Sequence, residues 1–135
     1  MQKESFMNNL YIAASPSTPE VDFQFDARRL SLKGEAYPEN AALFWGQIIA
    51  AVHSFIQQDD THAPITMDVA LAYFNSSSTK MLFSLFDALN EKAAHGTPVI
   101  LNWYHDAQDD TIYEFGQELC EDFTALTFRD HAIRD

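Results

Sequence analysis

The segment between residues 65 and 104 constrains the fold more than any other part of the chain. Residues 65–74 begin with alternating apolar and polar side chains, and the later part of this stretch, residues 69–74, is apolar on both faces. This predicts a central strand that is covered on both sides of a sheet. The side chains expected to point one way are Ile65, Met67, Val69, Leu71 and Tyr73. A helical stripe of apolar residues follows over 82–93 and stops at Gly96, and residues 99–104 return to a strand pattern. Strand, helix and strand form a βαβ unit, which predicts two parallel strands with a right-handed crossover.

The flanking segments complete a mixed α/β domain. Residues 21–26 and 30–34 alternate apolar and polar side chains, which predicts two half-buried strands in a hairpin. A helix is expected over about residues 41–58, with Asn40 as its N-cap. A third helix should follow the loop 105–110, and residues 125–128 predict a short last strand. The predicted order is β-β-α-β-α-β-α-β, a mixed sheet with about three helices packed on it. Residues 1–135 form one domain in this interpretation, with residues 1–13 as a loose N-terminal segment.

The charge balance excludes several classes of partner. The chain has 8 Lys and Arg residues against 20 Asp and Glu residues, so its net charge is −12. Such a chain repels nucleic-acid backbones and anionic membranes. No segment has the apolar length of a membrane span, so no direct membrane insertion is expected. The single cysteine, Cys120, is expected to be buried in the core, and the absence of an intrachain disulfide suits a cytoplasmic location.

No pattern of catalytic residues is present. The chain lacks the glycine motifs that bind nucleotide phosphates, and no nucleophile is paired with a positioned base. The five histidines are scattered without zinc-ligand spacing. The acidic loop 105–110 lacks the ligand spacing of a calcium-binding hand, and solvated charge is the simpler interpretation. We therefore predict a non-enzymatic protein with no catalytic residue, metal site or cofactor.

The best candidate site is the junction where the central strand meets its helix. Asn75-Ser76-Ser77-Ser78 stands at this point. Sites in open α/β sheets gather beyond the carboxyl ends of parallel strands, and the unpaired N–H groups of a helix N-terminus favour an anion. A hydroxyl placed here is a candidate for phosphorylation. The simpler alternative is an N-cap at Asn75 or Ser76 with the other serines in the first turn.

Three segments carry a resemblance to a known family. Residues 34–40, Gly-Glu-Ala-Tyr-Pro-Glu-Asn, resemble the G-x-S-Y-P-E-N motif of SiaC-like proteins, with Ala36 where serine is usual. Residues 73–80, Tyr-Phe-Asn-Ser-Ser-Ser-Thr-Lys, resemble that family's Y-x-N-[ST]-S-S-x-K phosphorylation segment. Thr18-Pro19 resembles its N-terminal T-P element. The resemblance spans about residues 14 to 130, and it implies a single regulatory domain that is distantly related to the STAS fold of anti-sigma-factor antagonists.

The resemblance also implies a function. In SiaC-like proteins a dedicated protein kinase phosphorylates the hydroxyl, and a metal-dependent phosphatase removes the phosphate. The unphosphorylated form binds and activates a diguanylate cyclase, which raises cyclic di-GMP and promotes biofilm formation. The matching acceptor is Ser76, and Ser77, Ser78 and Thr79 remain neighbouring candidates. The residues expected to contact the partner are Asn75, Ser76, Ser77, Thr79, Lys80, Tyr37, Pro38 and Asn40.

Three other functions compete with this interpretation. A partner switch that acts on an anti-sigma factor would use the same chemistry at Ser76. A small-molecule or nucleotide-binding module would use the same helix N-terminus. An enzyme is the least favoured. The placement of Tyr37, Pro38 and Asn40 at the rim of the Ser76 site is a hypothesis, and a purely structural turn is its alternative.

Overall fold

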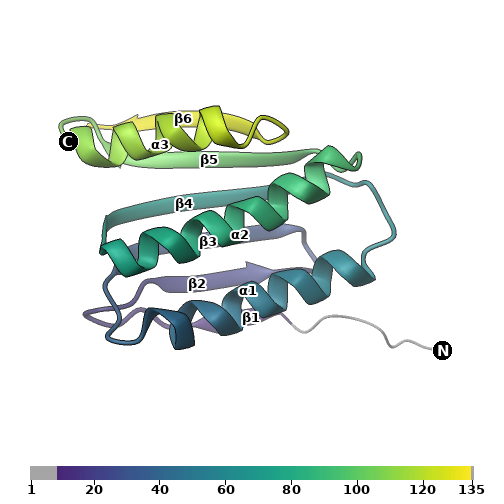
Figure 1. Cartoon of the computed structure of the whole chain (residues 1–135), viewed down its shortest axis with the longest axis horizontal. Helices are drawn as coiled ribbons and strands as arrows, with labels where there is room; N and C mark the ends of the chain where they lie inside the picture. Colours follow the sequence, from purple (N-terminus) through teal and green to yellow (C-terminus); the bar gives the residue numbers. More distant parts are fainter. Residues whose placement is uncertain (1–8, 135) are drawn as a thin grey trace.

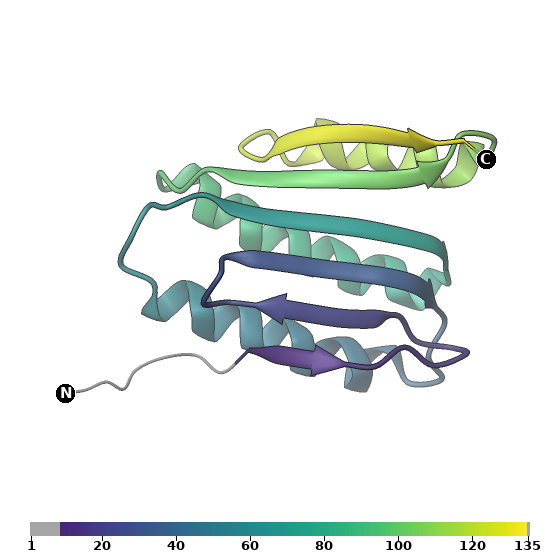
Figure 2. The same ribbon diagram turned by 180° about the vertical axis from the view of Figure 1, so that it is seen from behind.

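Residues 9–134 are described by a computed structural model, in which three helices lie on one face of a six-stranded sheet (Figures 1 and 2). The strands and helices, in chain order, are β1 (Leu10–Ile12), β2 (Glu20–Gln24), β3 (Arg29–Ala36), α1 (Ala41–Gln58), β4 (Ile65–Phe74), α2 (Ser76–Ala94), β5 (Val99–Asp106), α3 (Asp110–Asp122) and β6 (Thr127–Ile133).

The strand order in the sheet follows the sequence, from β1 at one edge to β6 at the other. β1, β2 and β3 pair antiparallel, whereas β3, β4, β5 and β6 pair parallel. Each parallel pair is joined by one helix, which is the connection that parallel neighbours need. The predicted mixed α/β fold with three helices is therefore confirmed.

The N-terminal segment is less loose than predicted. Leu10–Ile12 forms β1 and pairs with Val21–Phe23 of β2, so the prediction of a loose segment over residues 1–13 is wrong for these three residues. Residues 1–8 lie outside the described part. A strand this short has no periodicity of its own, and its pairing with β2 is what defines it. At the other end, β6 is longer than the predicted segment 125–128.

The core lies between the inner face of the sheet and the helices. Alternate residues of β2, β3, β4 and β5 point into it, and its largest fully buried side chains include Trp45, Trp103, Phe23 and Phe86. Within residues 9–134, no helix lies on the opposite face of the sheet (Figure 2), so the prediction of a strand covered on both sides is wrong. Ala70 and Ala72 on this face of β4 are half-buried and exposed, respectively.

The last residues of β4 also depart from the prediction. The sequence predicts that Tyr73 points the same way as Met67, but Met67 is fully buried whereas Tyr73 is 50% exposed. The cause is a register shift between Gly34 and Glu35, because the β3 residues pair with Leu71 and then with Tyr73, passing over Ala72. One residue out of register turns every later side chain to the other face.

Polar contacts run across the uncovered face of the sheet. Arg29 on β3 pairs with Asp68 on β4 at 3.0 Å, and Asn102 on β5 donates to the same carboxylate at 2.8 Å. His131 on β6 contacts the Asn102 amide oxygen at 2.9 Å. This line of contacts gives the face a polar character, which explains why it needs no helix to cover it.

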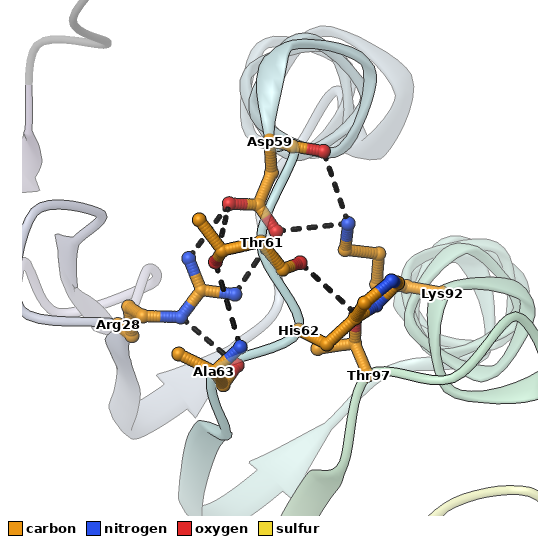
Figure 3. A network of polar contacts seen from close by, with 7 residues as sticks. All are labelled: Arg28, Asp59, Thr61, His62, Ala63, Lys92 and Thr97. Carbon is orange, nitrogen blue, oxygen red and sulfur yellow. Dashed lines mark hydrogen bonds and ion pairs between the residues drawn. The ribbon is translucent and has the colours of Figure 1, made fainter.

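A buried ion cluster joins the hairpin to two helix ends (Figure 3). Asp59, the C-cap of α1, receives two hydrogen bonds from Arg28 at 2.8 and 2.9 Å and a salt bridge from Lys92 at 2.8 Å. Its side chain is only 6% exposed. We call Arg28, Asp59 and Lys92 the Asp59 cluster. The Arg28 hydrogen bonds, with help from Lys92, outweigh burial and hold the pKa of Asp59 well below its usual range.

The predicted end of α2 at Gly96 is confirmed, whereas the predicted burial of Cys120 on α3 is wrong. Gly96 adopts a φ of 109°, as expected for the residue that ends α2, and His95 contacts the Glu91 carbonyl at 2.7 Å. Cys120 is exposed, so its predicted core position is wrong. The buried residues of α3 are Ile112, Gly116 and Leu119; Cys120 is one step around the helix from Leu119 and faces outward.

Candidate functional site

The N-termini of α1 and α2 lie side by side at the end of the sheet where β3 and β4 have their carboxyl ends. Asn40 caps α1 by accepting from the backbone N–H of Leu43 at 3.0 Å. Asn75 caps α2 in the same way, accepting from Ser78 at 2.9 Å. The backbone N–H of Asn75 also donates to the Ala36 carbonyl at 2.9 Å. The two motifs singled out in the sequence are thus tied together directly.

A hollow of about 550 Å³ lies between these two helix ends. We call it the N-terminal hollow. Its lining residues are Glu39, Asn40, Ala41, Ala42, Ser76, Ser77, Lys80 and Met81. Of the residues expected at the partner surface, it brings together Asn40, Ser76, Ser77 and Lys80. Pro38 is buried beneath the turn.

The four candidate hydroxyls have different surroundings. Ser76 and Ser77 are exposed and line the hollow. Ser78 is fully buried, and its hydroxyl accepts from the indole N–H of Trp45 at 3.0 Å. Thr79 is half-buried, and its hydroxyl donates to the Asn75 carbonyl at 3.2 Å. Only the first two serines are therefore fully accessible to another protein.

The electrostatics of the hollow differ from those of the rest of the chain. Neither α1 nor α2 has an acidic residue in its first turn. Two helix N-termini point their unpaired N–H groups at this region, and each carries a partial positive charge. Lys80 adds a cation, and Glu39 is the one acidic residue in the lining. An anion is therefore tolerated here better than elsewhere on a chain of net charge −12.

Exposed apolar side chains occur in the two motifs and in the first turn of α1. The rings of Tyr37 and Tyr73 meet edge to face with centroids 5.9 Å apart, and Tyr37 is 39% exposed. Leu43, in the first turn of α1, is 73% exposed. Exposed aromatic and aliphatic groups of this kind are typical of protein-binding surfaces. Sequence reasoning assigned Tyr73 to the core and did not select Leu43. For Leu43 the signal was its position outside the buried stripe of α1.

Two features that mark other functions are absent from the described part of the chain. Residues 9–134 contain no group of three His, Cys, Asp or Glu side chains placed to hold a metal ion. Within the same range, no helix combines the length and the apolar character that crossing a bilayer requires.

The structure defines a small α/β domain in which the N-termini of two helices and two accessible serines share one hollow. The sequence profile of the SiaC family regulatory phosphoproteins matches residues 12–133, and the chain belongs to this family. Members of this family are regulatory phosphoproteins, which confirms the resemblance and agrees with the predicted non-enzymatic role.

Relatives of known sequence and structure support the assignment. An uncharacterised protein of Pseudomonas aeruginosa (strain UCBPP-PA14) is 36% identical over 116 residues, covering 86% of this chain and 90% of its own. The crystal structure of apo-SiaC from Pseudomonas aeruginosa superposes with a TM-score of 0.84 at 35% identity, covering 93% of this chain and all of that one. A second crystal structure, of the diguanylate cyclase SiaD in complex with its activator SiaC, matches with the same TM-score and identity and covers 92% of this chain and 99% of that one.

Proposed function

We propose that this chain is a cytoplasmic switch protein that binds and activates a diguanylate cyclase, and that phosphorylation of Ser76 ends this binding. The observation that carries the proposal is the position of Ser76, which is exposed and lines the N-terminal hollow together with Asn40 and Lys80. The cyclase is the proposed partner because a family relative of high structural similarity activates one. A cognate protein kinase and a metal-dependent protein phosphatase are the proposed enzymes that add and remove the phosphate.

The local surroundings favour Ser76 and Ser77 over Ser78 and Thr79, and the family motif selects Ser76. Modifying Ser78 would require it to leave the core and would break its hydrogen bond with Trp45. Thr79 already donates to the Asn75 carbonyl. Ser77 is exposed as well, but Ser76 is the first residue of α2 and follows the capping Asn75 directly. Motif and accessibility thus agree on the same residue.

The expected effect of phosphorylation follows from two opposed free energies, the stabilisation of the phosphate within the domain and its cost at the interface with the partner. A phosphate adds about −1.5 to −2 charges at neutral pH. Inside the domain, the helix N-terminus stabilises this charge by roughly 0.3–1 kcal/mol, so the fold should stay intact. At an interface, an unpaired dianion costs several kcal/mol. A loss of about 3 kcal/mol weakens binding more than a hundredfold, so the interface term decides the outcome.

Binding measurements with matched variants test the proposal. We expect wild type and Ser76→Ala to bind the candidate diguanylate cyclase with similar affinity in isothermal titration calorimetry, and Ser76→Asp to bind at least about tenfold more weakly. Ser84→Asp is the control, since Ser84 is an exposed residue of the same helix outside the hollow. Equal affinity of all four proteins would contradict the switch. Peptide mass spectrometry of the protein from its native cells then tests the acceptor, with phosphate expected on Ser76.

A further inference from the structure

The parallel sheet splits between β4 and β5. Their pairing runs from Ile65 opposite Val99 to Val69 opposite Trp103 and stops there, although both strands continue. The two strands diverge toward their carboxyl ends (Figure 2). Beyond the split, β4 stays paired with β3 as far as Phe74, and β5 stays paired with β6 as far as Asp106. The sheet is therefore divided between β4 and β5 at this end, while each of these strands stays paired with its other neighbour.

A cavity of about 310 Å³ occupies the split. We call it the β4–β5 cleft. Its lining residues are Ala70, Leu71, Ala72, Tyr104, His105, Asp106, Asp109, Ile112 and Ile133. The wall is mostly apolar, and the ring of Tyr104 adds an aromatic surface. None of these residues lines the N-terminal hollow.

The charged groups of the cleft are predominantly negative. Asp106 and Asp109 each use one carboxylate oxygen to accept a backbone N–H, from Gln108 at 2.8 Å and from Ile112 at 3.0 Å. The only basic side chain in the lining is His105, and its two ring nitrogens contact the Asp130 carboxylate at 3.0 Å and the Asp106 carbonyl at 2.9 Å. Both partners of His105 are acceptors, and the Asp130 carboxylate compensates the charge that the ring carries when it is protonated. Two carboxylates remain to face a ligand.

The separated strand ends add hydrogen-bonding capacity. Beyond Val69 and Trp103, residues 70–72 and 104–106 are no longer paired across the split, and these residues line the cleft. Backbone carbonyls are strong acceptors that seek a donor. An ammonium group supplies up to three donors and a charge that matches the two carboxylates.

From these features we propose that the β4–β5 cleft binds a small organic cation, an amine attached to an apolar body. The volume lies at the lower end of the range for ligand cavities, about 300 Å³, which suits a single-ring compound. The alanines and Ile112 contact the apolar body, together with Tyr104, whose ring stacks on His131 with centroids 4.6 Å apart, and Asp106 and Asp109 pair with the charge. The site stands independently of the switch at Ser76.

Three isosteric probes test this assignment on the full chain. 2-Phenylethylamine, 2-phenylethanol and 3-phenylpropionate share an aromatic body and differ in charge. In ¹H–¹⁵N NMR titrations, the amine should shift the amide signals of residues 70–72 and 104–109 in a saturable way. The alcohol should bind at least about tenfold more weakly, and the carboxylate should give no saturable shift. No saturable shift with the amine, or equal shifts with all three probes, would overturn the proposal.

Charge-neutral variants give a second readout. The double variant Asp106→Asn with Asp109→Asn removes both charges, while each asparagine oxygen still accepts the same backbone N–H, and Asn remains a good cap for α3. Amine affinity should fall at least about tenfold. Asp110→Asn removes a neighbouring charge outside the cleft lining and should change affinity less than about twofold. An unchanged affinity in the double variant would refute the role of these carboxylates and with it the cation site.

Discussion

Replacing Asp59 by asparagine should destabilise the domain more than any other change of a single charge in the Asp59 cluster. The substitution keeps the shape of the side chain but removes the anion that Arg28 and Lys92 share. Arg28 and Lys92 have side chains that are 17% and 9% exposed, so water replaces the lost partner only in part. Breaking a buried ion pair in this way costs about 3–5 kcal/mol, and the partial exposure of Arg28 favours the lower value.

The assay is urea unfolding followed by circular dichroism at pH 7. A cost of about 3 kcal/mol is a large part of the free energy of unfolding, which is roughly 5–15 kcal/mol for a domain. In thermal unfolding the same cost should lower Tm by about 10 °C. Asp60→Asn is the matched control because Asp60 is the exposed neighbour, and its effect should stay within about 0.5 kcal/mol. Similar losses for the two variants would refute the reasoning.

The pH dependence gives an independent check. The folded pKa of Asp59 lies below its unfolded value because of the Arg28 and Lys92 contacts. Its contribution to stability is therefore full above the unfolded pKa of about 3.9 and is lost progressively as the pH falls below that value. The difference in stability between wild type and Asp59→Asn should shrink between pH 5 and pH 3. A difference that stays constant over this range would contradict the assignment.

Three further predictions concern packing and the β5–β6 contact. Ser78→Ala leaves the buried Trp45 N–H without its acceptor and should cost about 1–3 kcal/mol in urea unfolding, a loss that Trp45→Phe in the same chain should partly relieve. Gly116→Ala places a Cβ 2.6 Å from the Trp103 indole and should cost about 1–3 kcal/mol, whereas Gly46→Ala, with no atom within 4 Å, should be neutral or stabilising. Burial opposes the charged form of His105, but the hydrogen bonds to Asp130 and to the Asp106 carbonyl outweigh it and raise its pKa. Stability from His105 is thus full below about pH 6.5 and is lost as the pH rises through the folded pKa, and Asp130→Asn should flatten this dependence in unfolding measured from pH 5.5 to 9.

Local signals were sufficient to predict the order of most elements. The alternation in β2 and β3, the apolar stripe of α1 and the strand-helix-strand pattern from β4 to β5 are each visible within a short window. The caps at Asn40 and Asn75 also follow from local rules, because each side chain accepts the N–H three residues ahead. The family motifs then selected Ser76.

The features that were missed depend on pairing or on distant contacts. β1 is defined only by its partner β2, and the exposure of Tyr73 follows from a register shift in β3. The sequence did not indicate that one face of the sheet is uncovered. Ala70 and Ala72 count as apolar residues in the pattern, but such small side chains need little burial. The Asp59 cluster joins residues 31 and 33 positions apart, a separation that no periodicity reveals.

The sheet topology explains why the two sequence motifs meet, and this gives a test of how the switch works. β3 and β4 are parallel neighbours, and the helices that follow them lie on the same face of the sheet. α1 and α2 must therefore both begin near the carboxyl ends of these two strands (Figure 1). Asn40 and Ser76 therefore share one hollow although they are far apart in sequence. If phosphate acts through negative charge in this hollow, a carboxylate introduced from α1 should act in the same direction.

Asn40→Asp is the variant that isolates this effect. Aspartate caps a helix as well as asparagine does, so the fold should be kept, and unfolding measurements check this. The new charge should weaken binding to the cyclase in the absence of any phosphate, by a factor between those of Ser84→Asp and Ser76→Asp. Asn40→Ser keeps a cap without the charge and reports any loss of direct contact. Equal weakening by the aspartate and serine variants would show that contact rather than charge decides binding, and the electrostatic account of the switch would then fail.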